Sequence, residues 1–462
     1  MSQKPSLPRG TRDFGPAEVA KRQYVTGAIR RTFERYGFAP LETPSFENLS
    51  TLTGKYGEEG DQLLYRILNS GDFLSDVTAD DVAGGYKKVS SKVSEKGLRY
   101  DLTVPFARYV VMNRHALTLP FRRYQVQPVW RADRPSKGRY REFVQCDADV
   151  VGTDSLLCEA EIVLMIAEVM TTLGLPVELK INHRSLLRAL YDVLGDSAPE
   201  TDLYTALDKL DKIGWDGVGK ELIQRGFGEG AAARLQTLLA EAAAPLTPER
   251  LAAIGEAFAA SPATERAVAD LAAVVGYLTD SGFDDWANLQ LDLTLARGLS
   301  YYTGCIFEVK VPGASVGSVS GGGRYDNLTG GFGMPGLSGV GFSFGIDRLC
   351  DVLEERDAYP PGLATSTRVL LVHFDDPAAR AAALRCLAQI RAAGLSAELY
   401  PEAAKLKKQF AYADARQIPY VVVVGSEEAA AGQAKVKVMA TGAEHPLALD
   451  GELLRYLLAE DE

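Results

Sequence analysis

Alternation of apolar and polar residues is clearest in residues 121–152, where it predicts two strands joined by a basic turn. Side chains alternate between the two faces of a strand, so each strand has one set of residues per face. In the second strand the apolar face holds Val144, Cys146, Ala148 and Val150, and the polar face holds Gln145, Asp147 and Asp149. In the first strand one parity holds Arg123, Gln125, Gln127 and Arg131. If the two strands pair, we expect a polar face that has arginine at one end and carboxylates at the other, above an apolar face.

Helical patterns flank this hairpin in the sequence. Apolar residues recur at helical spacing over residues 18–36, where Gly37 is a stop signal, and over residues 155–174. Residues 98–105 predict a short strand that leads into a helix, and Asp101 is placed to cap that helix. Helices are therefore expected on both sides of the hairpin along the chain.

Two longer stretches lack the alternation of the hairpin. Residues 71–85 carry four aspartates among glycines, and we expect a solvated loop there. Residues 185–287 are alanine-rich with few strand signals, and are predicted to form an inserted helical domain. Their composition reports helix propensity and not function. Strands are predicted at residues 177–182, before this insertion, and at residues 289–296 and 305–311, after it.

The C-terminal part of the chain combines strand and helix patterns. Residues 339–349 predict a strand that breaks into a helix, and residues 359–367, which contain two prolines and a glycine, predict a linker. Beyond the linker, strands alternate with helices, which predicts a small parallel-type α/β domain. One helix of this domain is expected to carry Lys405, Lys407 and Lys408.

Length and composition fit a globular chain of several domains. The 462 residues correspond to roughly three domains at ~150 residues each. The start of the chain has no apolar segment of a secretory signal, and no apolar run reaches the ~18 residues that span a bilayer. These features predict a cytoplasmic protein. The net charge of −11 allows nucleic-acid binding only through local basic patches, with strong dependence on salt.

Cysteines and histidines give no metal or disulfide pattern. The five cysteines are scattered and never spaced as C-x-x-C, and the four histidines are isolated from one another. We therefore expect neither a disulfide framework nor a zinc site, and each histidine is expected to be structural or on the surface.

Arginines in strand-end and glycine-rich contexts are the most informative candidates for chemistry. The chain has no P-loop, and its one G-x-G-x-x-G match, residues 331–336, contains a proline and is not preceded by a predicted strand, so we expect a loop. Arginine can contact phosphate or carboxylate with two donors at once. Each such arginine alone is more typical of a structural ion pair, and the charged hairpin alone is more typical of a solvated surface. Together they suggest that a nucleotide is clamped on an antiparallel sheet by Arg131, Arg297, Arg324 and Arg348.

Several motifs resemble those of class II aminoacyl-tRNA synthetases. Residues 131–143 resemble motif 2, residues 341–349 resemble motif 3, and residues 37–44 resemble the weaker motif 1. The chain specifically resembles histidyl-tRNA synthetases in four further segments, namely residues 8–14, 98–103, 297–302 and 320–326. The resemblance covers nearly the whole chain except the helical insertion.

This resemblance implies an α+β fold: a catalytic domain built on an antiparallel sheet, a helical insertion and a C-terminal α/β anticodon-binding domain. The implied boundaries are 1–184 and 288–360 for the two parts of the catalytic domain, 185–287 for the insertion and 366–462 for the anticodon-binding domain. The implied activity joins L-histidine to ATP as histidyl-adenylate and then transfers histidine to the 3′ end of its tRNA. The implied partners are ATP with Mg²⁺, histidine, tRNA and a second copy of the chain in a homodimer.

The resemblance also assigns site residues. The α-amino group of histidine would be held by the segment Asp101, Leu102 and Thr103, together with Gln145. The imidazole would be read by Asp149, Tyr301 and Tyr302. The α-phosphate and the substrate carboxylate would be gripped by Arg131 and Arg297 from opposite sides. ATP would further contact Arg348, at the γ-phosphate, and Arg139. The Ser320–Asp326 loop would line the histidine and adenylate pocket, and the basic loop from Arg134 to Arg141 would guide the end of the tRNA.

Two alternative functions come from related proteins that do not charge tRNA. The first is the synthetase-like regulatory subunit of ATP phosphoribosyltransferase, which typically lacks the C-terminal domain and an intact arginine–tyrosine signature. The second is a synthetase-derived tRNA-sensing module, as in stress kinases, but this chain has no kinase motif. The complete motif set favours the enzyme over both.

Overall fold

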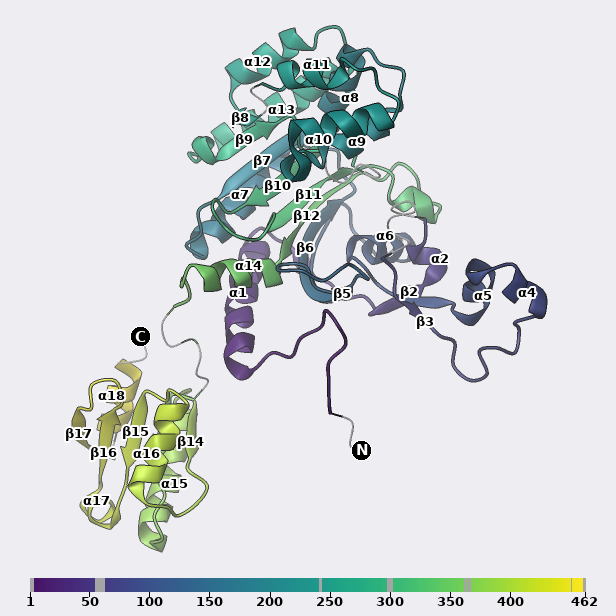
Figure 1. The fold of residues 1–462 in the computed structure, drawn as a ribbon. Helices are drawn as coiled ribbons and strands as arrows, with labels where there is room; N and C mark the ends of the chain where they lie inside the picture. The colour runs from purple at the N-terminus through teal and green to yellow at the C-terminus, as the bar shows by residue number, and fades with distance from the viewer. Residues whose placement is uncertain are drawn as a thin grey trace. The chain divides into compact units, whose positions relative to one another are not determined.

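The computed structural model describes residues 4–54, 63–240, 243–296, 302–360, 363, 367–449 and 451–459. Contacts divide the chain into two compact units, one formed by residues 1–12 and 24–358 and the other by residues 13–23 and 359–462. The larger unit contains the hairpin and the resembling motifs, and the smaller one contains the C-terminal α/β region (Figure 1).

A nine-stranded sheet forms the centre of the larger unit (Figure 1). Its strands are antiparallel to their neighbours except for two parallel pairs, β1 with β5 and β7 with β9. The strands in their order across the sheet are β1 (Ala39–Pro40), β5 (Phe121–Trp130), β6 (Glu142–Val151), β12 (Gly339–Gly345), β11 (Ser320–Tyr325), β10 (Cys305–Lys310), β7 (Glu178–His183), β9 (Leu289–Asp292) and β8 (Ala243–Pro245).

The predicted hairpin is strands β5 and β6, and its predicted division into two faces is confirmed. Arg123 pairs with Asp149 across the strands, and Gln125 pairs with Asp147. These four side chains are at most 3% exposed, so the polar face is buried and does not face open solvent. One detail of the prediction is wrong: Arg123 lies directly opposite a carboxylate, so that end of the face carries both signs of charge.

The apolar face of the sheet packs on aromatic residues of a long helix. Phe33 of α1 lies 5.6 Å from Phe342 in an edge-to-face arrangement, and Phe342 lies 5.4 Å from Phe344. Cys146 and Ala148 of β6 are also buried there. Because this face is closed by apolar packing, any site for a polar ligand on the sheet must use the opposite face. Helix α7 (Leu157–Thr172) connects β6 to β7, while α1 (Pro16–Arg35) precedes β1 and α14 (Ile346–Glu355) follows β12.

The predicted insertion is helical, with one exception. Strand β8 falls inside residues 185–287 and pairs with β9 at the edge of the sheet, although its Ala-Ala-Pro sequence gives no alternation signal. Figure 1 shows the insertion helices gathered beyond that edge. The helices are α8 (Arg184–Leu194), α9 (Glu200–Leu207), α10 (Leu210–Gln224), α11 (Ala231–Leu238), α12 (Pro248–Ala257) and α13 (Ala263–Asp280), followed by the 3-10 helix η1 (Trp286–Asn288).

A small three-stranded sheet extends from the side of the unit (Figure 1). The prediction of a loop over residues 71–85 is wrong in part, because Thr78 and Asp81 form a capping box that begins the helix α4. The elements of this region are β2 (Phe46–Asn48), β3 (Arg66–Ile67), β4 (Lys96–Leu98), α2 (Leu49–Leu52), α4 (Ala79–Ala83), α5 (Tyr86–Val93) and α6 (Thr103–Met112). Residues 331–336, expected to be a loop, begin within the 3-10 helix η2 (Thr329–Phe332) and lead towards β12.

The smaller unit holds a five-stranded sheet with its own apolar core. The prediction of a parallel-type domain is right for three strands only, because β16 and β17 run antiparallel to their neighbours. Its elements are β13 (Val369–Leu371), α15 (Pro377–Ala392), β14 (Ala397–Leu399), α16 (Leu406–Ala415), β15 (Tyr420–Val423), α17 (Ser426–Ala431), β16 (Gln433–Val438), β17 (Glu444–Ala448) and α18 (Glu452–Ala459). In the described parts of both units, every helix is too short or too polar to traverse a bilayer.

Candidate active site

Glycines in β11 and β12 leave room above the polar face of the sheet. A Cβ atom on Gly341 would lie 2.1 Å from Asp149 Oδ1, and one on Gly323 would lie 2.9 Å from Cδ1 of Tyr302. Real Cβ atoms do not approach other atoms so closely, so a side chain at either position would displace its neighbour. The two glycines therefore allow Asp149 and Tyr302 to lie close to the backbone of the central strands.

A chain of hydrogen bonds links the polar residues of β6 to β12. Gln145 Nε2 donates to the hydroxyl oxygen of Ser343 at 3.2 Å, and Ser343 is in turn hydrogen-bonded to Asp147. Gln145 Oε1 and Asp147 Oδ1 are buried and have no hydrogen-bond partner in the described part of the chain. Buried acceptors are normally paired, so these two atoms point to a ligand with N–H or O–H donors.

Asp149 is held by two neighbours on the same face. Its Oδ2 lies 2.8 Å from Nη2 of Arg123, and its Oδ1 accepts the hydroxyl of Tyr325 at 2.7 Å. Burial raises the pKa of Asp149, while the charge of Arg123 and the hydrogen bond from Tyr325 oppose that rise. Burial and the adjacent carboxylate raise the pKa of Tyr325 as well, so the phenol keeps its proton and donates it.

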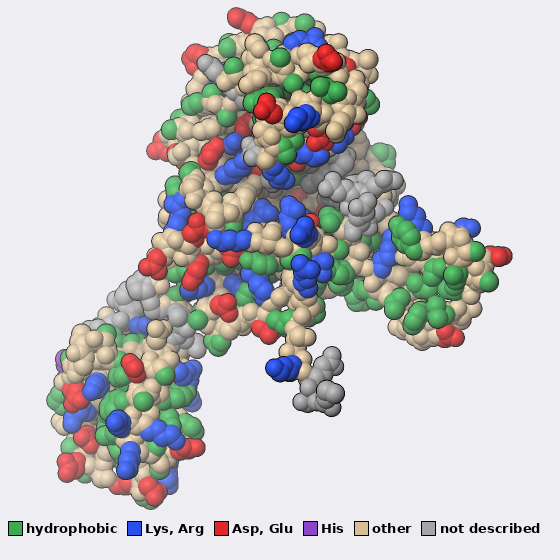
Figure 2. Space-filling model, viewed as in Figure 1, with side chains coloured by type: hydrophobic (Ala, Val, Ile, Leu, Met, Phe, Trp, Pro, Cys, Tyr) green, Lys and Arg blue, Asp and Glu red, His purple; other side chains and the backbone are tan. Residues whose placement is uncertain are grey.

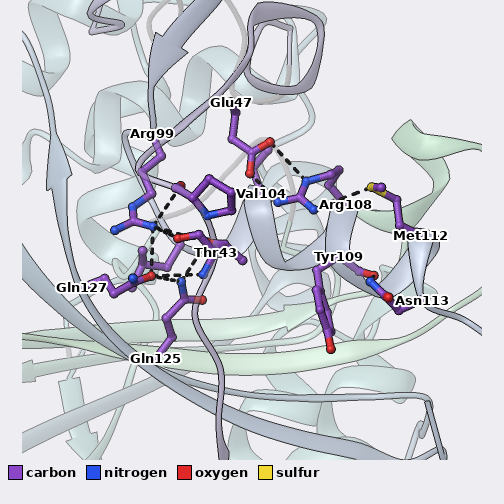
Figure 3. A network of polar contacts seen from close by, with 12 residues as sticks. Thr43, Glu47, Arg99, Val104, Arg108, Tyr109, Met112, Asn113, Gln125 and Gln127 are labelled. Carbon is purple, nitrogen blue, oxygen red and sulfur yellow. Dashed lines mark hydrogen bonds and ion pairs between the residues drawn. The ribbon is translucent and has the colours of Figure 1, made fainter. Parts of the chain in front are cut away.

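Arg99, two residues before the segment Asp101, Leu102 and Thr103, contacts Thr43 and Gln127 (Figure 3). Arg99 has no exposed surface, and its Nη1 donates to the carbonyls of Thr43 and Pro44 at 2.6 and 3.0 Å. Nη1 also donates to Gln127 Oε1 at 2.9 Å, and Nε donates to the carbonyl of Pro128 at 3.0 Å. Burial lowers the pKa of Arg99. This arginine joins the segment resembling motif 1 to strand β5.

The amine-binding residues implied by the resemblance lie at the start of α6. Asp101 Oδ1 accepts the backbone N–H of Val104 at 3.2 Å, so the aspartate does cap the helix as predicted. The carbonyl of Leu102 accepts Nη2 of Arg123 at 3.3 Å, which ties this segment to the polar face. Thr103 is the first residue of α6 and is half-buried. The structure therefore brings Asp101, Leu102 and Thr103 close to Arg123 and Asp149.

Arg131 lies at the end of β5 next to the same segment. Its Nε donates to the carbonyl of Tyr100 at 2.8 Å, and its guanidinium lies 5.2 Å from the centroid of the Phe143 ring. The side chain is half-buried. The arginine is therefore fixed next to Asp101, as a clamp on a substrate phosphate would require.

The basic loop after β5 is supported from two directions. Arg348 of α14 donates from Nε to the carbonyl of Gly138 at 2.9 Å and from Nη1 to the carbonyl of Ser318 at 2.6 Å. Arg139 is exposed, with its Nη1 3.7 Å from Asp133 Oδ1. Figure 2 shows Lys and Arg side chains gathered over the middle of the larger unit, where Figure 1 places β5, β6 and β12.

The N-terminal segment forms the second support. Arg12 forms an ion pair with Asp347 of α14, and its guanidinium lies 3.3 Å from the centroid of the Tyr140 ring. The other oxygen of Asp347 accepts the backbone N–H of Val144 at 3.0 Å, and the backbone N–H of Arg141 donates to the carbonyl of Gly10 at 2.9 Å. Gly10 and Arg12, in the segment singled out by resemblance, thus brace the basic loop against the helix that carries Arg348.

Arg324 does not belong to the predicted arginine clamp. A guanidinium has five N–H donors, and all five are used inside the protein. The acceptors are both carboxylate oxygens of Glu159, the carbonyls of Thr153 and Ser155, and the hydroxyl of Ser338. The Arg324 side chain is 5% exposed, so it is a buried structural ion pair, and the hypothesis that it binds nucleotide is wrong.

Two predicted site residues, Arg297 and Tyr301, lie outside the described residues, as does the rest of residues 297–301. Tyr302 is described, and its ring lies against Gly323. The sequence analysis did not assign roles to Arg123 and Asp147, which the structure adds to the polar face. Tyr325 lies in the predicted pocket-lining segment 320–326, most of which is strand β11 and not a loop. The parity of the hairpin already placed Arg123 and Asp147 on that face and was the signal that could have found them.

The sheet, its glycine-lined polar face and the braced loop of arginines define the catalytic domain of a class II aminoacyl-tRNA synthetase. The family profile described as histidyl-tRNA synthetase matches residues 10–349, and that of an anticodon binding domain matches residues 367–459. The chain belongs to the histidyl-tRNA synthetase family.

Individual relatives agree with this placement. The chain is 51% identical to "Histidine--tRNA ligase" of Cytophaga hutchinsonii, over 97% of this chain and 98% of the relative. It is 50% identical to the protein of that name from Bacteroides fragilis, over 99% of this chain and 100% of the relative. The crystal structure of histidyl-tRNA synthetase from Nostoc sp. PCC 7120 superposes with a TM-score of 0.82 at 29% identity, covering 99% of this chain and 100% of that one.

Proposed function

We propose that this chain is a histidine–tRNA ligase whose histidine pocket is the polar face of β5, β6 and β12. We place the histidine pocket here because Gln145 and Asp147, beside Asp149, have buried acceptors without hydrogen-bond partners among the described residues. Gly341 keeps this region open. The relatives with this activity match nearly the whole chain, including its C-terminal unit. A regulatory subunit of ATP phosphoribosyltransferase is therefore not favoured.

The first chemical step is attack of the histidine carboxylate on the α-phosphate of ATP, with release of pyrophosphate. Negative charge develops on the phosphate oxygens, and fixed guanidinium groups stabilise it without a protein nucleophile. Arg131 and Arg297 face the α-phosphate in this proposal, while Arg348 and Arg139 contact the rest of the triphosphate. In the second step the terminal ribose hydroxyl of the tRNA attacks the adenylate carbonyl, and AMP leaves.

Mg²⁺ would enter with ATP as part of the substrate and would offset phosphate charge. Among the described residues, no group of three or more His, Cys, Asp or Glu side chains could hold a metal ion. We therefore assign no step to a metal held by the protein. We also propose that the chain is cytoplasmic and forms a homodimer. The homodimer is proposed because residues 37–44 resemble motif 1. Arg99 holds this segment in place through the carbonyls of Thr43 and Pro44.

Recognition of the imidazole is expected to depend on Asp149. Replacing Asp149 with asparagine keeps the size of the side chain but removes an ionised acceptor. A charge-assisted hydrogen bond is worth on the order of 1.5–3 kcal/mol, so we expect kcat/KM for histidine to fall roughly 10- to 100-fold, with little change in KM for ATP. Pyrophosphate exchange, measured separately against histidine and ATP, tests this. An altered ATP dependence with an unchanged histidine dependence would remove Asp149 from the imidazole site.

The smaller unit is proposed to bind the anticodon of the tRNA. Lys407 and Lys408 lie on α16 and Lys405 immediately precedes it; all three are exposed. A chain that ends at Pro360 keeps every residue assigned to chemistry, so we expect histidine-dependent pyrophosphate exchange to be largely retained. Charging of tRNA should fall and lose its dependence on the anticodon. A folded truncated protein that charges tRNA as well as the full chain would contradict this assignment.

A further inference from the structure

Asp147 is a buried carboxylate of the pocket that lacks a full set of partners among the described residues. It lies at the middle of β6, two residues from Gln145 and two from Asp149, so all three share one face. Asp147 is 2% exposed, and its Oδ1 has no hydrogen-bond partner among the residues that the structure describes. Leaving a carboxylate oxygen buried and unpaired is costly, which suggests that a ligand supplies the missing donor.

The side chains directly across from Asp147 on the two adjacent strands do not supply that donor. Gln125 lies directly opposite on β5, and its Nε2 donates to Thr43 Oγ1 at 2.9 Å and to Gln127 Oε1 at 2.6 Å. An amide group has two N–H donors, so both are taken. Ser343 lies opposite on β12 and has a single hydroxyl hydrogen. Beyond Ser343, the next strand places Gly321, which has no side chain.

Asp149 differs from Asp147 in having an ion pair, although its Oδ2, like Asp147 Oδ1, has no hydrogen bond of normal geometry among the described residues. One of its oxygens pairs with Arg123 and the other accepts the hydroxyl of Tyr325. The surrounding network therefore directs its donors to Asp149 and leaves one oxygen of Asp147 unpaired. The polar face thus holds two carboxylates, Asp149, which Arg123 and Tyr325 hold in place, and Asp147, which keeps one oxygen open to a ligand.

The charges around Asp147 keep it close to a change of protonation at neutral pH. Burial raises its pKa to about 7, and Asp149 and Asp101 add to the rise, while Arg123 and the hydrogen bond from Ser343 oppose it. Arg99 also interacts electrostatically with Asp147. A donor that binds to the unpaired oxygen would favour the ionised form and release the proton.

We propose that Asp147 is a specificity-determining residue, whose ionised carboxylate accepts an N–H of the imidazole ring of the bound histidine. This inference rests on the proposed position of the histidine pocket. With the α-amino group held by Asp101, Thr103 and Gln145, the ring extends along β6 from Gln145 towards Asp149 and passes Asp147. An amino acid without a ring N–H leaves this carboxylate unpaired and is rejected.

The test is the binding of L-histidine to the full-length protein by calorimetry, in two buffers with different ionisation enthalpies. Because the pKa of Asp147 is raised to about 7, a fraction of this group is protonated at pH 7, so the unmodified protein should release a fraction of a proton per histidine from it. Asp147→Asn should weaken histidine binding roughly 10- to 100-fold and abolish that release. The KM for ATP in pyrophosphate exchange should stay unchanged. Asp80→Asn, an exposed carboxylate on α4, is the matched control and should behave as the unmodified protein.

The sign of the pH dependence gives a second readout. The pKa of Asp147 is raised in the empty pocket, so histidine affinity should increase as pH rises through about 7, and this increase should be missing in Asp147→Asn. Ser343→Ala removes a hydrogen bond that lowers this pKa, so the increase should move to higher pH. This variant decides the matter if Asp147→Asn does not fold.

Four outcomes separate the possibilities. Normal histidine affinity and proton release in Asp147→Asn would overturn the proposal, and so would an affinity that falls as pH rises through about 7, since Asp147 would then act as a donor. An unmoved pH profile in Ser343→Ala would also overturn it. An unmodified protein without histidine-dependent pyrophosphate exchange would instead contradict the proposed function.

Discussion

Arg131→Ala is expected to slow the formation of histidyl-adenylate by at least ~100-fold, by analogy with the loss of one donor from an oxyanion site. The guanidinium of Arg131 is fixed beside the amine-binding segment by its bond to the carbonyl of Tyr100. In the proposed reaction its contact with the α-phosphate would tighten as charge develops, so the loss should fall mainly on kcat. Single-turnover formation of the adenylate measures it, with Arg114→Ala, an exposed arginine after α6, as the control.

A structural role for Arg131 predicts a different pattern. If the residue only positioned Tyr100 and Asp101, its loss would raise KM for histidine and leave the chemical step intact. Arg131→Lys separates the two, because lysine keeps the charge but not the planar fork that can bond Tyr100 and a phosphate at once. Near-normal adenylate formation in Arg131→Ala would remove it from the clamp. The same assay applies to Arg297, whose position is assigned by resemblance alone.

The division of the hairpin into two faces was predictable from the sequence, but the pairing of Arg123 with Asp149 across the strands was not. Alternation over ten residues in each strand fixes which side chains face together, and an error of one residue would have buried the aspartates in the apolar layer. Short elements without such a pattern were not predictable. Strand β8 has three residues of low alternation, and the antiparallel strands β16 and β17 follow a region whose first strands suggest a parallel sheet.

The roles of individual charged residues were less predictable than their faces. Arg324 stands in a glycine-rich strand like a ligand-binding arginine, but its partner Glu159 lies 165 residues away, and no local pattern reveals that pairing. Asp147 was placed correctly beside Gln145 and Asp149. Its unpaired oxygen follows only from the tertiary network that uses both amide hydrogens of Gln125.

Glu159→Ala is expected to cause a large loss of stability. Glu159 has no exposed side-chain surface and accepts two of the five hydrogen bonds of Arg324, which joins α7 to β11. Removing it leaves a buried guanidinium without its counter-charge, and such a change costs roughly 3–5 kcal/mol. Unfolding by urea, followed by circular dichroism, measures the difference. Arg30→Ala breaks the exposed pair with Glu34 on α1 and should cost no more than about 0.5 kcal/mol.

The companion variants show whether the cost comes from the unpaired charge. Glu159→Leu combined with Arg324→Met removes both charges, so this double variant should be more stable than Glu159→Ala although it lacks more hydrogen bonds. Where the proteins stay folded, KM for ATP and for histidine should be close to normal, because Arg324 has no donor left for a substrate. If Arg324→Met alone abolished ATP binding with little change in the free energy of unfolding, the guanidinium would have to leave Glu159 during the reaction. The structural assignment of this ion pair would then be wrong.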